Sequence, residues 1–139
     1  EGLATEHDVS PSTVYYRIEQ YREEGILTGT IADLEPRELG FTLTAITEIK
    51  CDYGPGYEEL AEDIADLSGV HDVYFMLGEM SFTVISRVRN HGHLQRLIDE
   101  IIGLDGVEDS STHVVLKELK AESRLLVNYD DEDLNRMLD

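Results

Sequence analysis

The sequence predicts an α+β protein in which a truncated winged helix-turn-helix is followed by a ferredoxin-like βαββαβ domain. Three observations lead to this fold class: a helix with clear start and stop signals, an internal repeat, and alternating apolar residues around the repeated segments. We expect four parts along the chain: a helix-turn-helix part at 1–30, a connecting strand and linker at 31–40, a βαββαβ domain at 41–120, and an acidic tail at 121–139.

The first element is a helix that begins after Ser10, where a serine can accept from a free backbone N–H and Pro11 fits the first helical position. Gly25 suits the position after its last turn. Residues 3–19 thus resemble the second and third helices of a helix-turn-helix, and an ordinary capped surface helix is the alternative. The residues expected to face operator DNA are Ser10, Ser12, Thr13, Tyr15, Tyr16 and Arg17.

A short β element is expected after this helix. Residues 26–31 have the pattern of a strand interrupted by Gly29, and residues 33–36 have that of a turn. Short β structure behind a helix-turn-helix is typical of the winged form of that motif.

An internal repeat defines the second part of the chain. Residues 60–72 match residues 97–109 at a constant offset of 37 positions. Each copy has the pattern of an amphipathic helix, a glycine-containing turn and the start of a strand. The matching pairs are Leu60 with Leu97, Ile64 with Ile101, Leu67 with Leu104, Gly69 with Gly106, and Val70 with Val107.

Four strands are expected around these two helices. Residues 41–51 and 81–88 alternate as half-buried strands do. Residues 70–77 are richer in apolar side chains and predict a central strand, and residues 112–119 predict the last one. The resulting order is that of the split βαβ arrangement. Because apolar residues lie on both faces and the helices cover only one, we expect the open face to form a homodimer, with higher oligomers as a further possibility.

The net charge of −19 opposes an encounter with DNA phosphates. Up to Thr30 the chain holds six acids against only Arg17 and Arg22. One explanation is a halophilic protein, because molar salt shortens the Debye length to about 3 Å and screens such charges. The other is a protein that does not bind DNA. We favour the first, because the acids are spread along the whole chain.

The remaining composition argues against several kinds of site. The single cysteine, Cys51, cannot form an internal disulfide and suits a reducing compartment. No apolar run is long enough to span a bilayer, so we expect a cytoplasmic protein without a membrane partner. His91 and His93 do not have the spacing of a usual zinc site, so we expect no metal. No cofactor motif or catalytic constellation stands out, so we expect no cofactor and no enzyme activity.

Motifs spread over residues 3–119 carry a family resemblance. They are residues 10–14, 17–19, 24–27, Pro36 with Leu39-Gly40, 69–70, 78–82 and 112–116. Together they resemble the leucine-responsive regulator family, Lrp/AsnC. The resemblance implies a transcription regulator that dimerises, often assembles further, and senses a small molecule, commonly an amino acid. The family's first DNA-binding helix has no counterpart in this sequence, so we expect weakened DNA binding.

The family's Gly-Asp-aromatic turn appears here as Gly78-Glu79-Met80. Glycine permits a tight or positive-φ turn. Backbone N–H groups there and the Glu79 carboxylate can hold the two ends of a zwitterion, and hydroxyl donors follow at residues 110–112. The resemblance places the effector where such turns from neighbouring dimers meet. The candidate effector-binding residues are Leu77, Gly78, Glu79, Met80, Ser81, Phe82, Ser110, Ser111, Thr112 and His113. A plain hairpin with a polar strand edge is the alternative.

Two other functions stay under consideration. Sirohaem decarboxylases resemble the same family and share its architecture, but this chain has no tryptophan, and residues 74–77 lack a histidine-aromatic pair. The second of these alternatives is a ligand-binding module that acts by protein contact without DNA.

Overall fold

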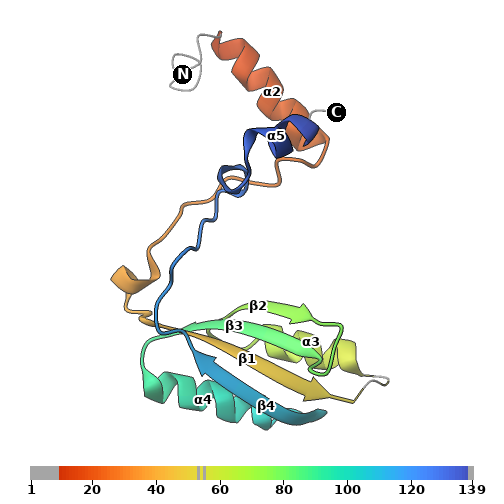
Figure 1. Cartoon of the computed structure of the whole chain (residues 1–139), viewed down its shortest axis with the longest axis vertical. Helices are drawn as coiled ribbons and strands as arrows, with labels where there is room; N and C mark the ends of the chain where they lie inside the picture. The colour runs from red at the N-terminus through yellow and green to blue at the C-terminus, as the bar shows by residue number, and fades with distance from the viewer. Residues whose placement is uncertain (1–9, 53, 55, 138–139) are drawn as a thin grey trace. The chain divides into compact units, whose positions relative to one another are not determined.

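The computed structural model describes residues 10–52, 54 and 56–137, and the first of the two expected DNA-binding helices lies outside these ranges. The chain forms two compact units that divide between Leu34 and Glu35, and each is described by itself. The elements are α2 (Pro11–Glu23), the 3-10 turn η1 (Pro36–Leu39), β1 (Leu43–Cys51), α3 (Tyr57–Ala65), β2 (Val70–Phe75), β3 (Phe82–Val88), α4 (His91–Ile102), β4 (Val107–Val114), the 3-10 turn η2 (Leu125–Asn128) and α5 (Asp131–Met137) (Figure 1).

Helix α2 begins and ends as its sequence predicts. Ser10 Oγ accepts from the Thr13 N–H at 3.2 Å, and Pro11 occupies the first turn. At the other end, Gly25 has a φ of 77°. The Gly25 N–H donates to Arg22 O at 3.1 Å and the Ile26 N–H to Tyr21 O at 2.9 Å. These two bonds form a Schellman cap, which satisfies carbonyls that a helix end leaves free.

The strand predicted at residues 26–31 does not form. Residues 27–35 have no regular secondary structure, and the side chains of Ile26 and Ile31 are exposed. A strand requires a hydrogen-bonded neighbour, and nothing pairs with this segment in the described part of the chain. Apolar alternation alone was therefore not sufficient evidence for a wing.

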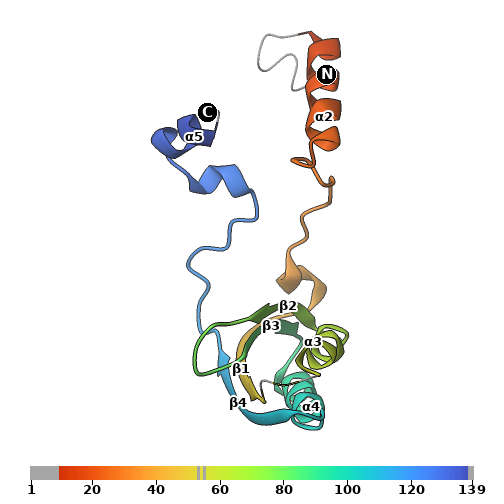
Figure 2. The same ribbon diagram turned by 90° about the vertical axis from the view of Figure 1, so that its right-hand side faces the viewer.

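The second unit contains the predicted βαββαβ fold. Its four strands form one antiparallel sheet in the order β2-β3-β1-β4. Helices α3 and α4 both lie on one face of this sheet, and the other face carries no helix of the domain (Figure 2). The connection order and one-sided helical layer are those of a ferredoxin-like fold.

The core lies between the sheet and the two helices. It contains alternate residues of β1 and β3 and the inward stripes of α3 and α4, as the sequence periodicity predicts. The completely or nearly completely buried apolar residues are Ala45, Ile49, Cys51, Leu60, Ile64, Phe82, Val84, Val88, Leu94, Leu97 and Ile101.

Two strand predictions need correction. The apolar segment 70–77 was expected to be central, yet β2 is an edge strand and ends at Phe75. The last strand was expected at 112–119, but β4 begins at Val107 and ends at Val114. Pairing with β1 explains the second shift. Register partners extend from Cys51 opposite Val107 to Ala45 opposite Val114, so residues beyond 115 have no strand beside them.

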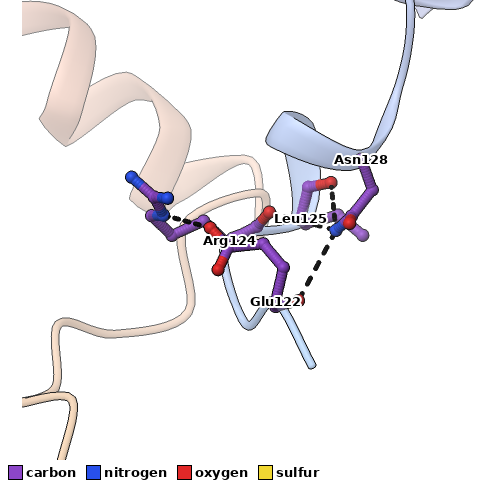
Figure 3. A network of polar contacts seen from close by, with 4 residues as sticks. All are labelled: Glu122, Arg124, Leu125 and Asn128. Atoms are coloured by element: carbon purple, nitrogen blue, oxygen red, sulfur yellow. Dashed lines mark hydrogen bonds and ion pairs between the residues drawn. The ribbon is translucent and has the colours of Figure 1, made fainter. Parts of the chain in front are cut away.

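The acidic tail has local order. Asn128 Nδ2 donates to the carbonyl oxygens of Arg124 and Leu125, each at 3.2 Å, and to Glu122 O at 3.5 Å. Glu122 also forms an ion pair with Arg124 (Figure 3). Asp130 Oδ1 accepts from the Asp133 N–H at 2.9 Å and caps α5, whose acidic first turn suits the helix dipole.

Candidate functional site

The connection between β2 and β3, residues 76–81, is an apolar turn with an exposed tip and one charge. Leu77 is fully exposed, Met76 is 43% exposed, and Glu79 is the only ionisable residue between the two strands. Gly78 has a φ of 145°, and a Cβ added there would meet nothing within 4 Å. The expected positive φ is present, and it connects an edge strand to a central one rather than two central strands.

The base of this turn is firmly held. The Met76 N–H donates to Ser81 O at 2.7 Å, and the Ser81 N–H donates to Ile49 O at 2.9 Å. The Phe75 ring stacks on Tyr57 at 5.0 Å between centroids and meets Phe82 edge-on at 5.3 Å. Tyr57 and Phe75 were missed from sequence, because only the fold brings the start of α3 beside the end of β2.

Two of the predicted effector residues face the core instead of the solvent. Ser81 and Phe82 are 0% and 1% exposed. Their side chains cannot touch a ligand in this chain as folded. They could contribute to a site only by holding the turn in place. The side chains of Leu77, Glu79 and Met80 are the ones that reach solvent.

The second group of candidate residues, on β4, is divided between the two faces of the sheet. Ser110 and Thr112 lie on the helix side, where Thr112 Oγ1 is 3.1 Å from Thr47 Oγ1. Ser111 and His113 lie on the open side, with Ser111 Oγ 3.4 Å from His113 Nε2. The period of a strand imposes this division, so the expected hydroxyl cluster does not form.

Within one chain, the turn and β4 do not form a single site. In the strand register Ile49 lies between Ser110 and Phe82, so β1 separates the two groups. Neighbouring strands lie about 4.8 Å apart, and the two groups are thus two strand spacings from each other. A site containing both groups would have to take them from different copies of the chain.

The predicted DNA-facing residues lie on an exposed helix. Tyr15, Tyr16 and Arg17 are all exposed, and no described residue of α2 is buried. The hydroxyls of Ser12 and Thr13 lie 3.2 and 2.7 Å from Ser10 Oγ, so the three form one cluster at the helix start. Arg22 pairs with Glu19 at 2.8 Å, which leaves Arg17 as the basic side chain of α2 without an ion-pair partner in the described part of the chain.

The open face of the sheet is mixed in character. Ile46 and Ile85 are register partners at its centre, and both are half-buried. Glu48 and Thr83 form the next pair. The apolar area is therefore smaller than the sequence suggested, because Val114 lies on the helix side and Leu116 lies beyond the strand.

The structure also forms a cavity that sequence analysis did not find. It has a volume of about 550 Å³ and lies between the end of β1, the start of α3 and the turn after α4. Four carboxylates line it: Asp52, Glu59, Asp63 and Asp105. Next to it, a hydrogen bond that the Glu108 carboxyl donates to Asp52 and the repulsion by the Asp52 charge raise the pKa of Glu108. Such a surface attracts cations from solution.

Of the two histidines at the start of α4, His93 has a structural role. His93 Nδ1 accepts from the Arg89 N–H at 3.1 Å. Burial, with the nearby charges of Arg89 and Arg96, lowers the pKa of His93. In the described residues, no three His, Cys, Asp or Glu side chains are grouped so that they could hold a metal ion. Among the helices described, none has the length and apolar character needed to cross a membrane.

A ferredoxin-like domain with an exposed hairpin turn, preceded by a capped helix of the helix-turn-helix type, defines a class: ligand-responsive transcription regulators. The family model of the Lrp/AsnC ligand binding domain matches residues 44–125. An uncharacterised HTH-type transcriptional regulator of Pyrococcus abyssi is 35% identical over 123 residues, which are 88% of this chain and 83% of that protein. The chain belongs to the Lrp/AsnC family of transcription regulators.

Solved structures agree with this assignment. AsnC of Escherichia coli has a TM-score of 0.79 at 27% identity and covers 88% of this chain and 83% of its own. A transcriptional regulator of Neisseria meningitidis, solved in complex with L-methionine, has a TM-score of 0.84 at 23% identity over 91% and 83% of the two chains, which shows the shared fold. The resemblance read from the sequence motifs is confirmed.

Proposed function

We propose that this regulator binds operator DNA through α2 and senses an amino acid at the β2–β3 turn. The observation that carries the proposal is the turn itself: a firmly held base, an exposed tip and a single carboxylate, in a domain of the Lrp/AsnC ligand-binding family. A related fold from Neisseria meningitidis was solved with L-methionine, which supports the ligand class. Glu79 would take the ammonium group, and backbone N–H groups near Gly78 the carboxylate.

Calorimetry with each of the twenty amino acids tests the effector. Glu79→Gln should weaken the binding of the best ligand about tenfold or more, because a charge-assisted hydrogen bond contributes about 1.5–3 kcal/mol. Glu62→Gln is the matched control, since Glu62 is also exposed but lies on α3. If no amino acid binds, or if both variants bind like the wild type, the proposed site is wrong.

DNA binding should respond to salt in an unusual way. A protein that neutralises phosphates loses affinity with a log–log slope of about −0.9 per phosphate as salt rises. In the described part of the chain, Arg17 is the basic side chain of α2 that has no ion-pair partner, and Glu23 and Glu24 lie near the end of the helix. We therefore expect affinity that stays level or rises up to molar KCl, because cations must screen or bridge these acids.

Selection from a random duplex library at several KCl concentrations tests this. Arg17→Ala should reduce DNA retention, whereas Arg22→Ala, the matched control, should change it little because Arg22 is already paired with Glu19. A steep fall in affinity with salt would contradict the cation role. Retention of no DNA at any salt would favour a module that acts by protein contact.

The open face of the sheet is the proposed dimer surface. Ile46 and Ile85 form its apolar centre. Ile85→Asp should shift the protein toward monomer in light scattering, whereas Ile102→Asp should not, because Ile102 is an exposed isoleucine on α4. A wild-type chain that is monomeric at micromolar concentration would refute the surface.

We further propose that the chain is not an enzyme. The relatives and solved structures named above are transcriptional regulators. A sirohaem decarboxylase would bind a tetrapyrrole and acquire a strong visible spectrum. After a tetrapyrrole is added and the unbound excess is removed, the purified chain should therefore retain no visible absorbance.

A further inference from the structure

Ser81 is a buried hydroxyl at the point where the β2–β3 turn meets the sheet. It is 0% exposed and lies one residue before β3. Its Oγ accepts from the Cys51 N–H at 3.2 Å and is 3.4 Å from Cys51 O. Its own N–H donates to Ile49 O at 2.9 Å, and its carbonyl accepts from the Met76 N–H at 2.7 Å. One residue therefore connects the turn to the end of β1.

The end of β1 needs such a partner. The register between β1 and β3 ends with Ile49 opposite Phe82, so Cys51 has no register partner on β3. A buried backbone N–H without an acceptor is costly. Ser81 supplies both an acceptor and a donor to the Cys51 backbone, so the end of the β1–β3 pairing becomes an attachment point for the turn.

The tip of the turn has no other polar attachment. In the described part of the chain, no hydrogen bond or ion pair holds the side chain of Glu79, and no backbone bond joins residues 77–80 to the sheet. The position of the tip is therefore set at its base, by Ser81 and by the Phe75 ring between Tyr57 and Phe82.

We propose that Ser81 is a positioning residue for the effector site: it does not touch the ligand but fixes the turn that carries Glu79. This inference rests on the proposed function of the turn. A site whose contacts are ordered before binding avoids the cost of ordering them afterwards. Removing the Ser81 hydroxyl should therefore weaken effector binding even where the fold is intact.

The chain offers a matched control on the strand that follows Ser81. Ser86 is 1% exposed, lies within β3 and donates through Oγ to Ala45 O at 3.4 Å. It lies in the middle of the sheet, with Ala45 and Val70 as its register partners, and has no contact with the turn. Ser81→Ala and Ser86→Ala thus remove the same group from the same kind of environment.

The experiment measures effector affinity and amide exchange in the wild type and both variants. The probe is the amino acid that binds the wild type best among the twenty. Ser81→Ala should raise its dissociation constant about tenfold and speed hydrogen exchange at the Met76 amide, and Ser86→Ala should change neither. Equal affinity for Ser81→Ala and the wild type, or an equal loss in both variants, would overturn the positioning role.

Two further outcomes separate this inference from the proposed function. If the wild type binds no amino acid, the proposed function fails, and exchange at Met76 and Cys51 still tests the attachment. If Ser81→Ala does not fold, the same two amides are measured in the wild type. Protection comparable to that of the β3 amides supports the attachment, and exchange as fast as at Leu77 refutes it.

Discussion

The two copies of the repeat, α3 with β2 and α4 with β4, bury the same positions of their helices. Leu60 and Leu97 are 4% and 3% exposed, and Ile64 and Ile101 are 0% and 1% exposed. The turns also agree, because Gly69 and Gly106 have φ values of 95° and 97°. The copies differ in the segment that follows each of them. The first leads into the exposed β2–β3 turn, and the second leads into the tail. The residues that the two copies share therefore build the helices and turns of the domain. The candidate effector site lies in the β2–β3 turn, which only the first copy leads into.

The largest expected effect tests whether the two helices contribute equally to the core. Ile64→Ala and Ile101→Ala should each lower the free energy of unfolding by about 2–5 kcal/mol, because each leaves a cavity beneath the sheet. Urea denaturation measures both. Ile102→Ala, at an exposed position on α4, should cost much less. If only one of the two buried changes is costly, the cores of the copies are not equivalent.

The turn glycines should distinguish the copies. Alanine at either positive φ costs about 1–2 kcal/mol. A Cβ on Gly69 would also lie 3.3 Å from the backbone oxygen of Arg87, whereas one on Gly106 meets only the flexible Leu60 side chain at 3.6 Å. Gly69→Ala should therefore lower the thermal midpoint further than Gly106→Ala. Gly29→Ala is the control, since a Cβ there meets nothing within 4 Å. If both variants lower the thermal midpoint equally, the close approach at Gly69 has no effect on stability and the two turns are equivalent.

The helix starts should differ as well. Asn90 Oδ1 accepts from the His93 N–H at 2.9 Å and caps α4, whereas α3 follows Gly56 without a side-chain cap. Asn90→Ala should cost about 0.5–2 kcal/mol, and Asn90→Ser should restore most of it, because serine caps nearly as well. Chemical denaturation of the two variants decides the point. A serine variant as unstable as the alanine variant would show that the cap does not matter.

The smallest expected effect is sensitivity to acid in the second copy. At the matching position of the first copy stands Gly56, so only α4 carries a histidine there. The pKa of His93 is lowered in the fold, chiefly by burial, and its Nδ1 accepts a hydrogen bond that needs the neutral ring. Its contribution to stability is present above the ordinary histidine pKa of about 6.5 and is lost as pH falls through the lowered value.

A comparison of pH profiles checks this prediction. His93→Gln should be less stable than the wild type near neutral pH, and the gap should narrow as the pH falls below 6. The control is His91→Gln, at an exposed position two residues earlier. A gap that stays constant across this range would mean that titration of His93 has no part in stability.

Much of the scaffold could be read from the sequence, because local patterns specify it. Ser10, Pro11 and Gly25 marked the ends of α2, and the repeat marked both domain helices. The β4 boundaries were wrong because they depend on the length of β1, and residues 107–111 include acids and serines that disfavour strands. The prediction of a wing strand at residues 26–31 was wrong, because a strand needs a pairing partner that the described residues do not supply.

The candidate site was less predictable than the scaffold. The sequence located the turn around Gly78 and Glu79, since glycine and family motifs are local signals. It could not show that Ser81 points into the core, that residues 110–113 alternate between two faces, or that Tyr57 stacks on Phe75. Each of these facts depends on which strand lies beside which, and that order is set by the whole domain.

The position of β1 at the centre of the sheet has a consequence for the order of folding. The β2–β3 hairpin joins strands that follow each other directly, but β1 pairs with β3 and β4, which lie far along the chain. Closing long loops before their contacts form is slow. On the ribosome, β1 must therefore wait for β3 and then β4 to emerge. The apolar side chains of β1 stay without their final neighbours during that interval, which makes this strand the segment most exposed to aggregation before the domain closes.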